Sequence, residues 1–251
     1  MALQHIIVPL YIYPEEEAWA PLAAAARRHA NINFLAIINP NNGPGAGPLP
    51  DASYRASLRR LQSISNIQLL GYVHCTYGRR PREDVCRDVD RYYGWNAQRL
   101  RVDGIFVDEV PSAADAVPYM ADLATHVRSV WTRHSSAAPS VLVFNPGVVV
   151  DADLVVLADY VVAFEQAHEQ WRVLRAEHEA LRLEVCNKAL AIVHTTSSED
   201  GSIEEVLQDA KGAGFAGLYI TDQHGGGFTR WPAQWDNFVQ LLSYSTAREE
   251  T

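Results

Sequence analysis

Eight short runs rich in β-branched and aromatic residues recur along the 251-residue chain, and a turn and then helical sequence follow each of them. The runs are apolar on both faces, as in IIVPL, FLAII, GIFV and YVVAF, which is what a parallel sheet covered by helices requires. This repetition predicts an α/β fold in which residues 1–251 form a single closed (β/α)8 TIM barrel. The expected strands are His5–Tyr13, Asn33–Pro40, Leu69–Cys75, Gly104–Val110, Ser140–Asn145, Asp159–Gln166, Ala189–Thr195 and Gly217–Asp222.

The helical pattern between these runs favours the closed barrel over an open, doubly wound sheet. An open sheet normally carries a glycine-rich phosphate-binding fingerprint after its first strand, and none is present here. The Gly- and Pro-rich segment Asn41–Pro50 predicts a long loop and not a domain linker, because helical pattern resumes at once. The helices expected are Glu15–His29, Asp51–Ser65, Asp115–His134, Ala167–Leu183, Ile203–Lys211 and Trp231–Tyr244.

Charge and hydropathy narrow the classes of partner. The formal net charge is −9, and nucleic-acid binding depends mainly on Lys and Arg, so a neutral or cationic substrate fits better than nucleic acid. No apolar run approaches the roughly 18 residues that cross a bilayer, and the N-terminus lacks the pattern of a signal peptide. We therefore expect no membrane span, a cytoplasmic location if the chain is complete and secretion if an export signal has been removed. The oligomeric state is left open.

Polar residues at the ends of the expected strands are the first candidates for a functional site, because such barrels build their active sites at the carboxyl ends of the strands. The opposite strand ends are largely apolar or begin with Gly, and this asymmetry predicts an enzyme. The candidates are Tyr11, Tyr13, Asn39, Asn42, His74, Tyr77, Asp108, Glu109, Asn145, Glu165, His194 and Asp222.

Three of these candidates are carboxylates, which suits glycosidic cleavage by one acid and one nucleophile or base. Asp108 and Glu109 are consecutive, so in a regular strand they face opposite ways, and one should face the substrate while the other orients it or lies at the rim. Glu165 follows an apolar run, where burial should raise its pKa and suit it to act as an acid. Retention and inversion both stay open at this point.

Other chemistries find less support in the sequence. The HGGG string at His224–Gly227 would need a G-x-S-x-G nucleophile elbow, and the chain has none. Neither H-x-H nor H-E-x-x-H occurs, so we expect no catalytic metal and no other cofactor. Cys75 and His74 are consecutive strand residues that face opposite ways, which disfavours a thiol nucleophile with a histidine base.

Six motifs in chain order together resemble the spherulin-4 family. This family includes glycoside hydrolase family 135, fungal barrel enzymes that cleave α-1,4-linked N-acetylgalactosamine in galactosaminogalactan. Each motif alone is weak, but six in order, from the first strand to the sixth, are specific. The motifs are IVPLYIYP (Ile7–Pro14), INPNNGPG (Ile38–Gly45), LGYVHCTYGRRP (Leu70–Pro81), GIFVDEVP (Gly104–Pro111), FNPG (Phe144–Gly147) and VAFE (Val162–Glu165).

The resemblance implies that Asp108, Glu109 and Glu165 occupy the family's catalytic positions, in a hydrolase that acts on a polysaccharide or oligosaccharide. It also implies that Asn39, Asn42, His74, Tyr77 and Asn145 line the sugar site. Tyr11 would offer a flat apolar face to a sugar ring, and His194 and Asp222 would add hydrogen bonds.

One departure keeps two alternatives open. The characterised hydrolases of the family are secreted or membrane-anchored, whereas this chain begins almost at its first strand. The barrel could instead serve an intracellular biosynthetic enzyme, a lyase, isomerase or cyclase with the same site and a different small molecule. The second alternative is a carbohydrate-binding barrel without catalysis.

Overall fold

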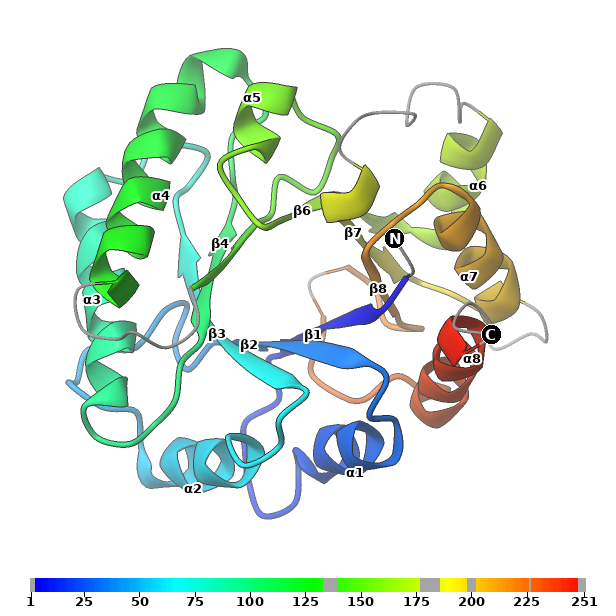
Figure 1. The fold of residues 1–251 in the computed structure, drawn as a ribbon, viewed down its shortest axis with the longest axis horizontal. Coiled ribbons are helices and arrows are strands. Elements are labelled where there is room, and N and C mark those ends of the chain that lie inside the picture. Colours follow the sequence, from blue (N-terminus) through cyan, green and yellow to red (C-terminus); the bar gives the residue numbers. More distant parts are fainter. Residues whose placement is uncertain (1–2, 133–139, 177–185, 198–201, 226, 248–251) are drawn as a thin grey trace.

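The protein is a closed barrel of eight parallel strands, each hydrogen-bonded to its neighbours in chain order, with β8 paired to β1 (Figure 1). The computed structural model describes residues 3–132, 140–176, 186–197, 202–225 and 227–247. All eight predicted strands and the closed-barrel topology are confirmed, with first and last residues that differ by at most three positions. The strands are β1 (His5–Leu10), β2 (Asn33–Ile38), β3 (Ile67–His74), β4 (Gly104–Asp108), β5 (Val141–Phe144), β6 (Tyr160–Ala167), β7 (Ala189–His194) and β8 (Gly217–Ile220).

Helices surround the barrel between successive strands (Figure 1). One of them, α3, was not singled out from the sequence, although its buried stripe Val85, Val89 and Tyr92 has helical spacing. The first helix begins at Ala20 and not at Glu15, because Glu16 has a positive φ of 43°. The helices are α1 (Ala20–Arg28), α2 (Ala52–Leu61), α3 (Arg82–Asn96), α4 (Val117–Thr132), α5 (Ala152–Val155), α6 (His168–Ala176), α7 (Ser202–Gly212) and α8 (Trp235–Ala247).

Close packing of α3 on β3 fixes the strand that leads to one side of the barrel mouth. A Cβ atom on Gly71 would lie 2.5 Å from the Tyr92 ring, so only glycine allows this approach. The Tyr92 hydroxyl donates to the carbonyl of Ile38 at the end of β2. Strands β2 and β3 are therefore tied to one helix just below the mouth.

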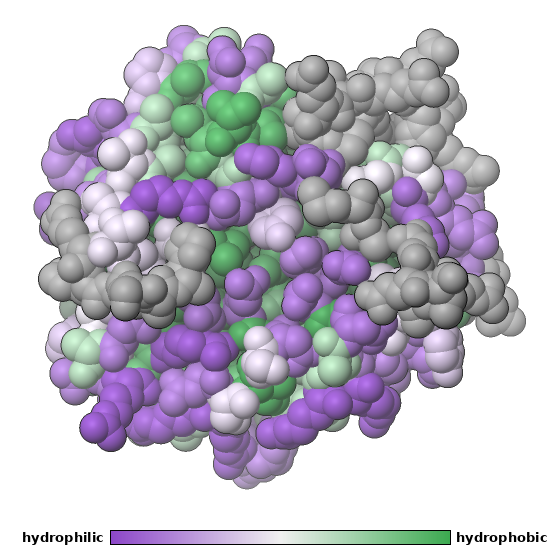
Figure 2. Space-filling view, in the orientation of Figure 1, coloured by the Kyte–Doolittle hydropathy of each residue, from purple (hydrophilic) through white to green (hydrophobic). Residues whose placement is uncertain are grey.

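The short helix α5 leaves apolar side chains uncovered. Figure 2 shows an apolar patch over α5 on a face that is otherwise mostly hydrophilic. Val148, Val149 and Val156 are the exposed valines of this part of the chain, with Val156 69% exposed. Within the described ranges, no helix has the length and apolar character needed to span a bilayer.

Candidate active site

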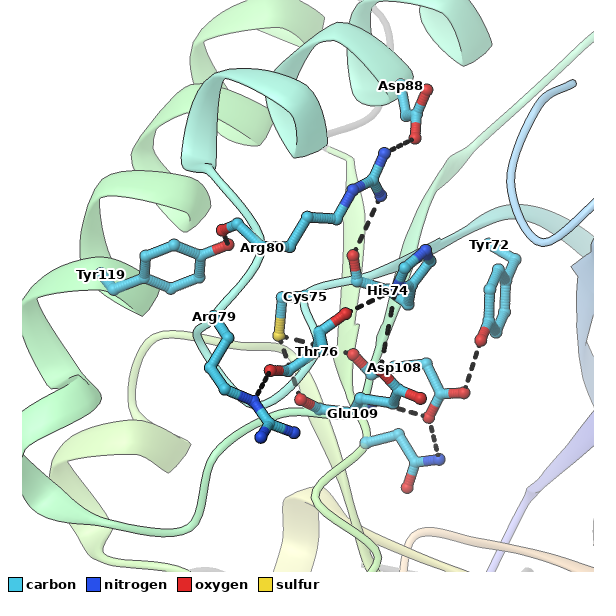
Figure 3. A network of polar contacts seen from close by, with 11 residues as sticks. Tyr72, His74, Cys75, Thr76, Arg79, Arg80, Asp88, Asp108, Glu109 and Tyr119 are labelled. Carbon is cyan, nitrogen blue, oxygen red and sulfur yellow. Dashed lines mark hydrogen bonds and ion pairs between the residues drawn. The ribbon is translucent and has the colours of Figure 1, made fainter. Parts of the chain in front are cut away.

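Two carboxylates and an amide form a hydrogen-bonded cluster at the carboxyl ends of β4, β5 and β6. The Asn145 amide nitrogen donates to Asp108 Oδ1 at 2.8 Å and to Glu165 Oε2 at 2.6 Å. The Tyr72 hydroxyl donates to Asp108 Oδ2 at 2.7 Å, and the Glu109 amide donates to Asp108 Oδ1 at 2.8 Å (Figure 3). The structure therefore brings together two of the three predicted catalytic acids with Asn145 between them.

The Asn145 bridge sets an upper limit on the separation of the two acids. Since both carboxylate oxygens bond to the same nitrogen, at 2.8 and 2.6 Å, they lie at most about 5.4 Å apart. Carboxyl groups about 5–5.5 Å apart are typical of retaining glycosidases, whereas inverting enzymes need roughly 6.5 Å or more to admit a water molecule. The limit applies to the two bridged oxygens, and it is compatible with the spacing of retaining glycosidases.

An irregularity in β6 aims Glu165 into the cluster. The pairing of β6 with β7 shifts register between Val162 and Phe164, so one extra residue is accommodated there. Bulges of this kind change the alternation of side chains and are common beside active sites. Phe164 packs on Trp171 of α6, with ring centroids 5.1 Å apart, while Glu165 meets Asn145. The amide of Glu165 also donates to the carbonyl of Gly147, which ties β6 to the β5 loop.

The two acids differ in how their charge is compensated. Burial raises the pKa of Glu165 to about 6, although the hydrogen bond from Asn145 works against the rise and the charge of Asp108 adds to it. This agrees with the expectation from the apolar run before it. Burial also raises the pKa of Asp108, but three donors, from Tyr72, Glu109 and Asn145, oppose that rise. Glu165 is thus the better proton donor and Asp108 the better-stabilised anion.

Glu109 turns away from this pair because the chain leaves the strand directly after Asp108. Its φ of 53° lies in the left-handed region, which costs a residue other than glycine roughly 1–3 kcal/mol. The turn brings Glu109 Oε2 to 3.6 Å from His74 Nδ1, and His74 also contacts Thr76 Oγ1 at 3.0 Å (Figure 3). The regular alternation assumed from the sequence therefore ends at Asp108, and Glu109 lies beside His74 with 38% of its side chain exposed.

The predicted aromatic residues have different surroundings. Tyr11 packs edge-on against Tyr72 and Phe228, and burial raises the pKa of its hydroxyl, with the charges of Asp108 and Glu165 adding to the rise. A sugar-binding role for Tyr11 stays a prediction. Tyr77 is 56% exposed, and the Arg79 guanidinium lies 5.8 Å from its ring centre. Tyr13 is 46% exposed and donates to Asp51, away from the acids.

Two predicted asparagines shape the long loop after β2. Asn39 Oδ1 accepts a hydrogen bond from the amide of Gly43, so its side chain orders the loop. Asn42 adopts a positive φ of 47°, which asparagine tolerates better than most residues. Residues 41–50 contain neither helix nor strand, as predicted for this segment. A sugar-binding role for the two side chains stays a prediction.

The predicted residues at the end of β7 and after β8 contact other residues on the same side of the mouth. His194 Nδ1 contacts Thr195 Oγ1 at 2.9 Å, and its ring lies so close to Gly225 that a Cβ atom there would be 2.7 Å from Nε2. Asp222 forms an ion pair with Arg230 at 2.6 Å and caps the amide of Ala233. Arg230 lowers the pKa of Asp222. Binding of a sugar by His194 or Asp222 stays a prediction.

Tyr72 belongs to the cluster but was not among the residues predicted from the sequence. Its position two residues before His74 on β3 was the available signal, since alternate strand residues share a face. Among the described residues, no group of three or more His, Cys, Asp or Glu side chains is arranged to hold a metal ion.

Comparisons with known proteins agree with this architecture. The structure of Aspergillus clavatus Sph3 in complex with GalNAc superposes with a TM-score of 0.87 at 30% identity, covering 96% of this chain and 98% of that one. Chitinases from Bacteroides thetaiotaomicron and Rhizomucor miehei share the fold at 8% and 10% identity, with TM-scores of 0.59 and 0.56, over at least 97% of this chain and 98% and 99% of theirs. The barrel is thus of the kind that glycoside hydrolases use.

The sequence relationships are more specific. Spherulin-4 of Physarum polycephalum is 32% identical over 225 residues, which cover 86% of this chain, and the chain spans 63% of the length of that relative. The family model for spherulation-specific family 4 matches residues 5–242, almost the whole barrel. The chain therefore belongs to spherulation-specific family 4.

Proposed function

We propose that this protein is an endo-acting glycoside hydrolase that cleaves α-1,4-linked N-acetylgalactosamine in a polymer such as galactosaminogalactan. The observation that carries the proposal is the Asn145 bridge, which holds two differently stabilised acids within about 5.4 Å of each other. The relationship to Sph3, solved with GalNAc, supports the choice of amino sugar. A hydrophilic substrate also fits this barrel mouth, because the side chains of Glu109 and Glu165 are partly exposed to solvent.

In the proposed reaction, Glu165 protonates the oxygen of the departing sugar while Asp108 attacks the anomeric carbon from the opposite face. The donors on Asp108 keep it anionic until attack, and the raised pKa of Glu165 keeps its proton available near neutral pH. Glu165 then accepts a proton from the water that releases the sugar from Asp108. For an α linkage, the 2-acetamido group lies on the leaving-group side and does not attack from behind, so an enzyme carboxylate or a water molecule must attack, and we assign this role to Asp108.

The test is hydrolysis of fully N-acetylated and partly deacetylated α-1,4-galactosaminan oligomers, with products read by mass spectrometry and the first-formed anomer by NMR. We expect internal cleavage with an α-anomeric first product, and loss of cleavage in Glu165→Gln. Glu83→Gln is the matched control, because Glu83 is an exposed carboxylate on α3, 70% accessible. A folded parent that cleaves no oligomer would contradict the proposal and favour an enzyme acting on another small molecule. Binding without turnover would instead favour a carbohydrate-binding barrel.

A further inference from the structure

The loop after β3 has a backbone that is unusual for its sequence. Thr76, Tyr77 and Gly78 have successive positive φ values of 49°, 54° and 77°. Such values suit glycine but are unfavourable for Tyr, and more so for a β-branched residue such as Thr. The segment it faces, at the end of β4, contains Glu109, which has a φ of 53°. Two strained turns therefore lie against each other beside the acids.

Hydrogen bonds from the first turn hold the second. The Cys75 amide donates to the carbonyl of Asp108 at 3.1 Å, and the Tyr77 amide donates to the carbonyl of Glu109 at 2.7 Å. The Cys75 thiol lies between these carbonyls, with Sγ 3.4 Å from the oxygen of Asp108 and 3.2 Å from that of Glu109 (Figure 3). Its single hydrogen is therefore shared by the two acceptors.

The loop that carries Cys75 is itself anchored to the surrounding helices. Arg80 Nη1 donates to the carbonyl of His74 at 3.0 Å, and Arg80 Nη2 pairs with Asp88 of α3 at 2.5 Å (Figure 3). The Tyr119 hydroxyl of α4 donates to the carbonyl of Arg80 at 3.0 Å. The position of the thiol is thus set by α3 and α4.

We propose that Cys75 is a positioning residue, whose thiol and the Tyr77 amide together hold Glu109 in its left-handed conformation and direct its carboxylate to His74 and the barrel mouth. The catalytic part of this inference depends on the proposed glycosidase function. Cys75 is fully buried, and burial raises the pKa of its thiol to about 11, so it keeps the proton that it donates at neutral pH. The thiol and the Tyr77 amide thus hold the backbone carbonyl of Glu109, and this fixes the direction of its carboxylate.

The kinetic test compares Cys75→Ala, which removes the donor, with Cys75→Ser, which keeps one. Cys86→Ala is the matched control, since this thiol lies on α3 in a groove facing α4. The Cys75 thiol also bonds to the carbonyl of Asp108, the attacking acid of the proposed reaction. We therefore expect Cys75→Ala to displace Asp108 slightly and to lower kcat roughly tenfold or more, with a smaller change in KM. Cys75→Ser should recover to within about threefold of the parent. A lower Tm with unchanged kcat in both Cys75 variants would overturn the proposal.

Two further measurements do not depend on turnover. They test whether Cys75 holds Glu109 even if the parent cleaves no polymer. In a crystal structure of Cys75→Ala, we expect Glu109 to leave its positive φ and its carboxylate to move away from His74; an unchanged Glu109 would overturn the proposal. In the Cys86→Ala/Cys186→Ala variant, which retains a single thiol, the infrared S–H stretch should lie at the lower frequency of a hydrogen-bonded thiol. A stretch at the frequency of a free thiol would also overturn it.

Discussion

The two sides of the barrel mouth use their polar residues differently. On the side formed by β3 to β6, hydrogen bonds connect side chains from four strands, those of Tyr72, Asp108, Asn145 and Glu165. On the side formed by β7 and β8, Asp222 is paired with Arg230 from its own loop, and His194 contacts the adjacent Thr195. Both sides carry strand-end polar residues, but among the described residues only those of the first side are joined across strands by hydrogen bonds between their side chains.

This difference shows that a position at the barrel mouth does not by itself make a side chain reactive. A strand-end position is enough to bring a side chain to the mouth, but a reacting acid also needs neighbours that set its charge and hold its direction. Asp108 has three donors and Glu165 has a raised pKa, whereas Arg230 stabilises the charge of Asp222 and lowers its pKa. We therefore expect substitutions to have large effects on the first side and small effects on the second.

The largest expected effect is that of Asp108→Asn. The amide keeps the size of the side chain but removes the anion that attacks the sugar, so kcat should fall by roughly 1,000-fold or more, as for other nucleophile removals. The measurement is kcat on N-acetylated oligomers together with a circular dichroism spectrum that verifies folding. If the variant retains more than a tenth of the parent activity, Asp108 is not the nucleophile, and the proposed difference between the two sides of the mouth is wrong.

A second prediction concerns the bridge itself, through Asn145→Ala. This change leaves two neighbouring carboxylates without their shared donor, and kcat should fall roughly 100-fold because the acids repel and move apart. The bond from Asn145 lowers the pKa of Glu165, so its loss should raise that pKa above about 6. The alkaline limb of the pH–rate profile should therefore move to higher pH. Asn237→Ala on α8 serves as the control, and an unmoved alkaline limb would contradict the assigned bridge.

A third prediction links the same side of the mouth to stability. Burial raises the pKa of Glu165 from 4.5 to about 6 in the folded protein, so the folded form binds this proton more tightly than the unfolded chain does. That advantage is complete below pH 4.5 and disappears as the pH rises through 6, a change of about 2 kcal/mol. Glu165→Gln does not ionise at this position.

Urea unfolding at pH 4 and pH 7 measures this effect. The free energy of unfolding of Glu165→Gln, relative to the parent, should be higher at pH 7 than at pH 4 by about 2 kcal/mol. Glu83→Gln, on the exposed face of α3, should show no such dependence. A pH-independent difference between Glu165→Gln and the parent would mean that Glu165 is not destabilised by burial as an anion.

The sequence predicted the barrel well because its strands are apolar on both faces and lie at regular intervals, and these patterns depend only on local residues. It also predicted which acids reach the mouth. It could not predict the direction of Glu109, because the strand alternation stops at a left-handed residue, nor the bulge that aims Glu165. The sequence also did not predict that Asn145 bonds to two carboxylates, because an asparagine that binds carboxylates has the same place in the sequence as one that binds a sugar.

The smallest expected effect is that of Asp222→Asn on the other side of the mouth. Asp222 accepts from Arg230 and from the amide of Ala233, and an Asn side-chain oxygen can still accept the bond from Ala233. The pair with Arg230 is exposed, and exposed ion pairs contribute little to stability. We expect kcat and KM on the oligomers to stay within about threefold of the parent. A tenfold rise in KM with unchanged kcat would show that Asp222 leaves Arg230 to bind sugar, which would extend the substrate site across the whole mouth.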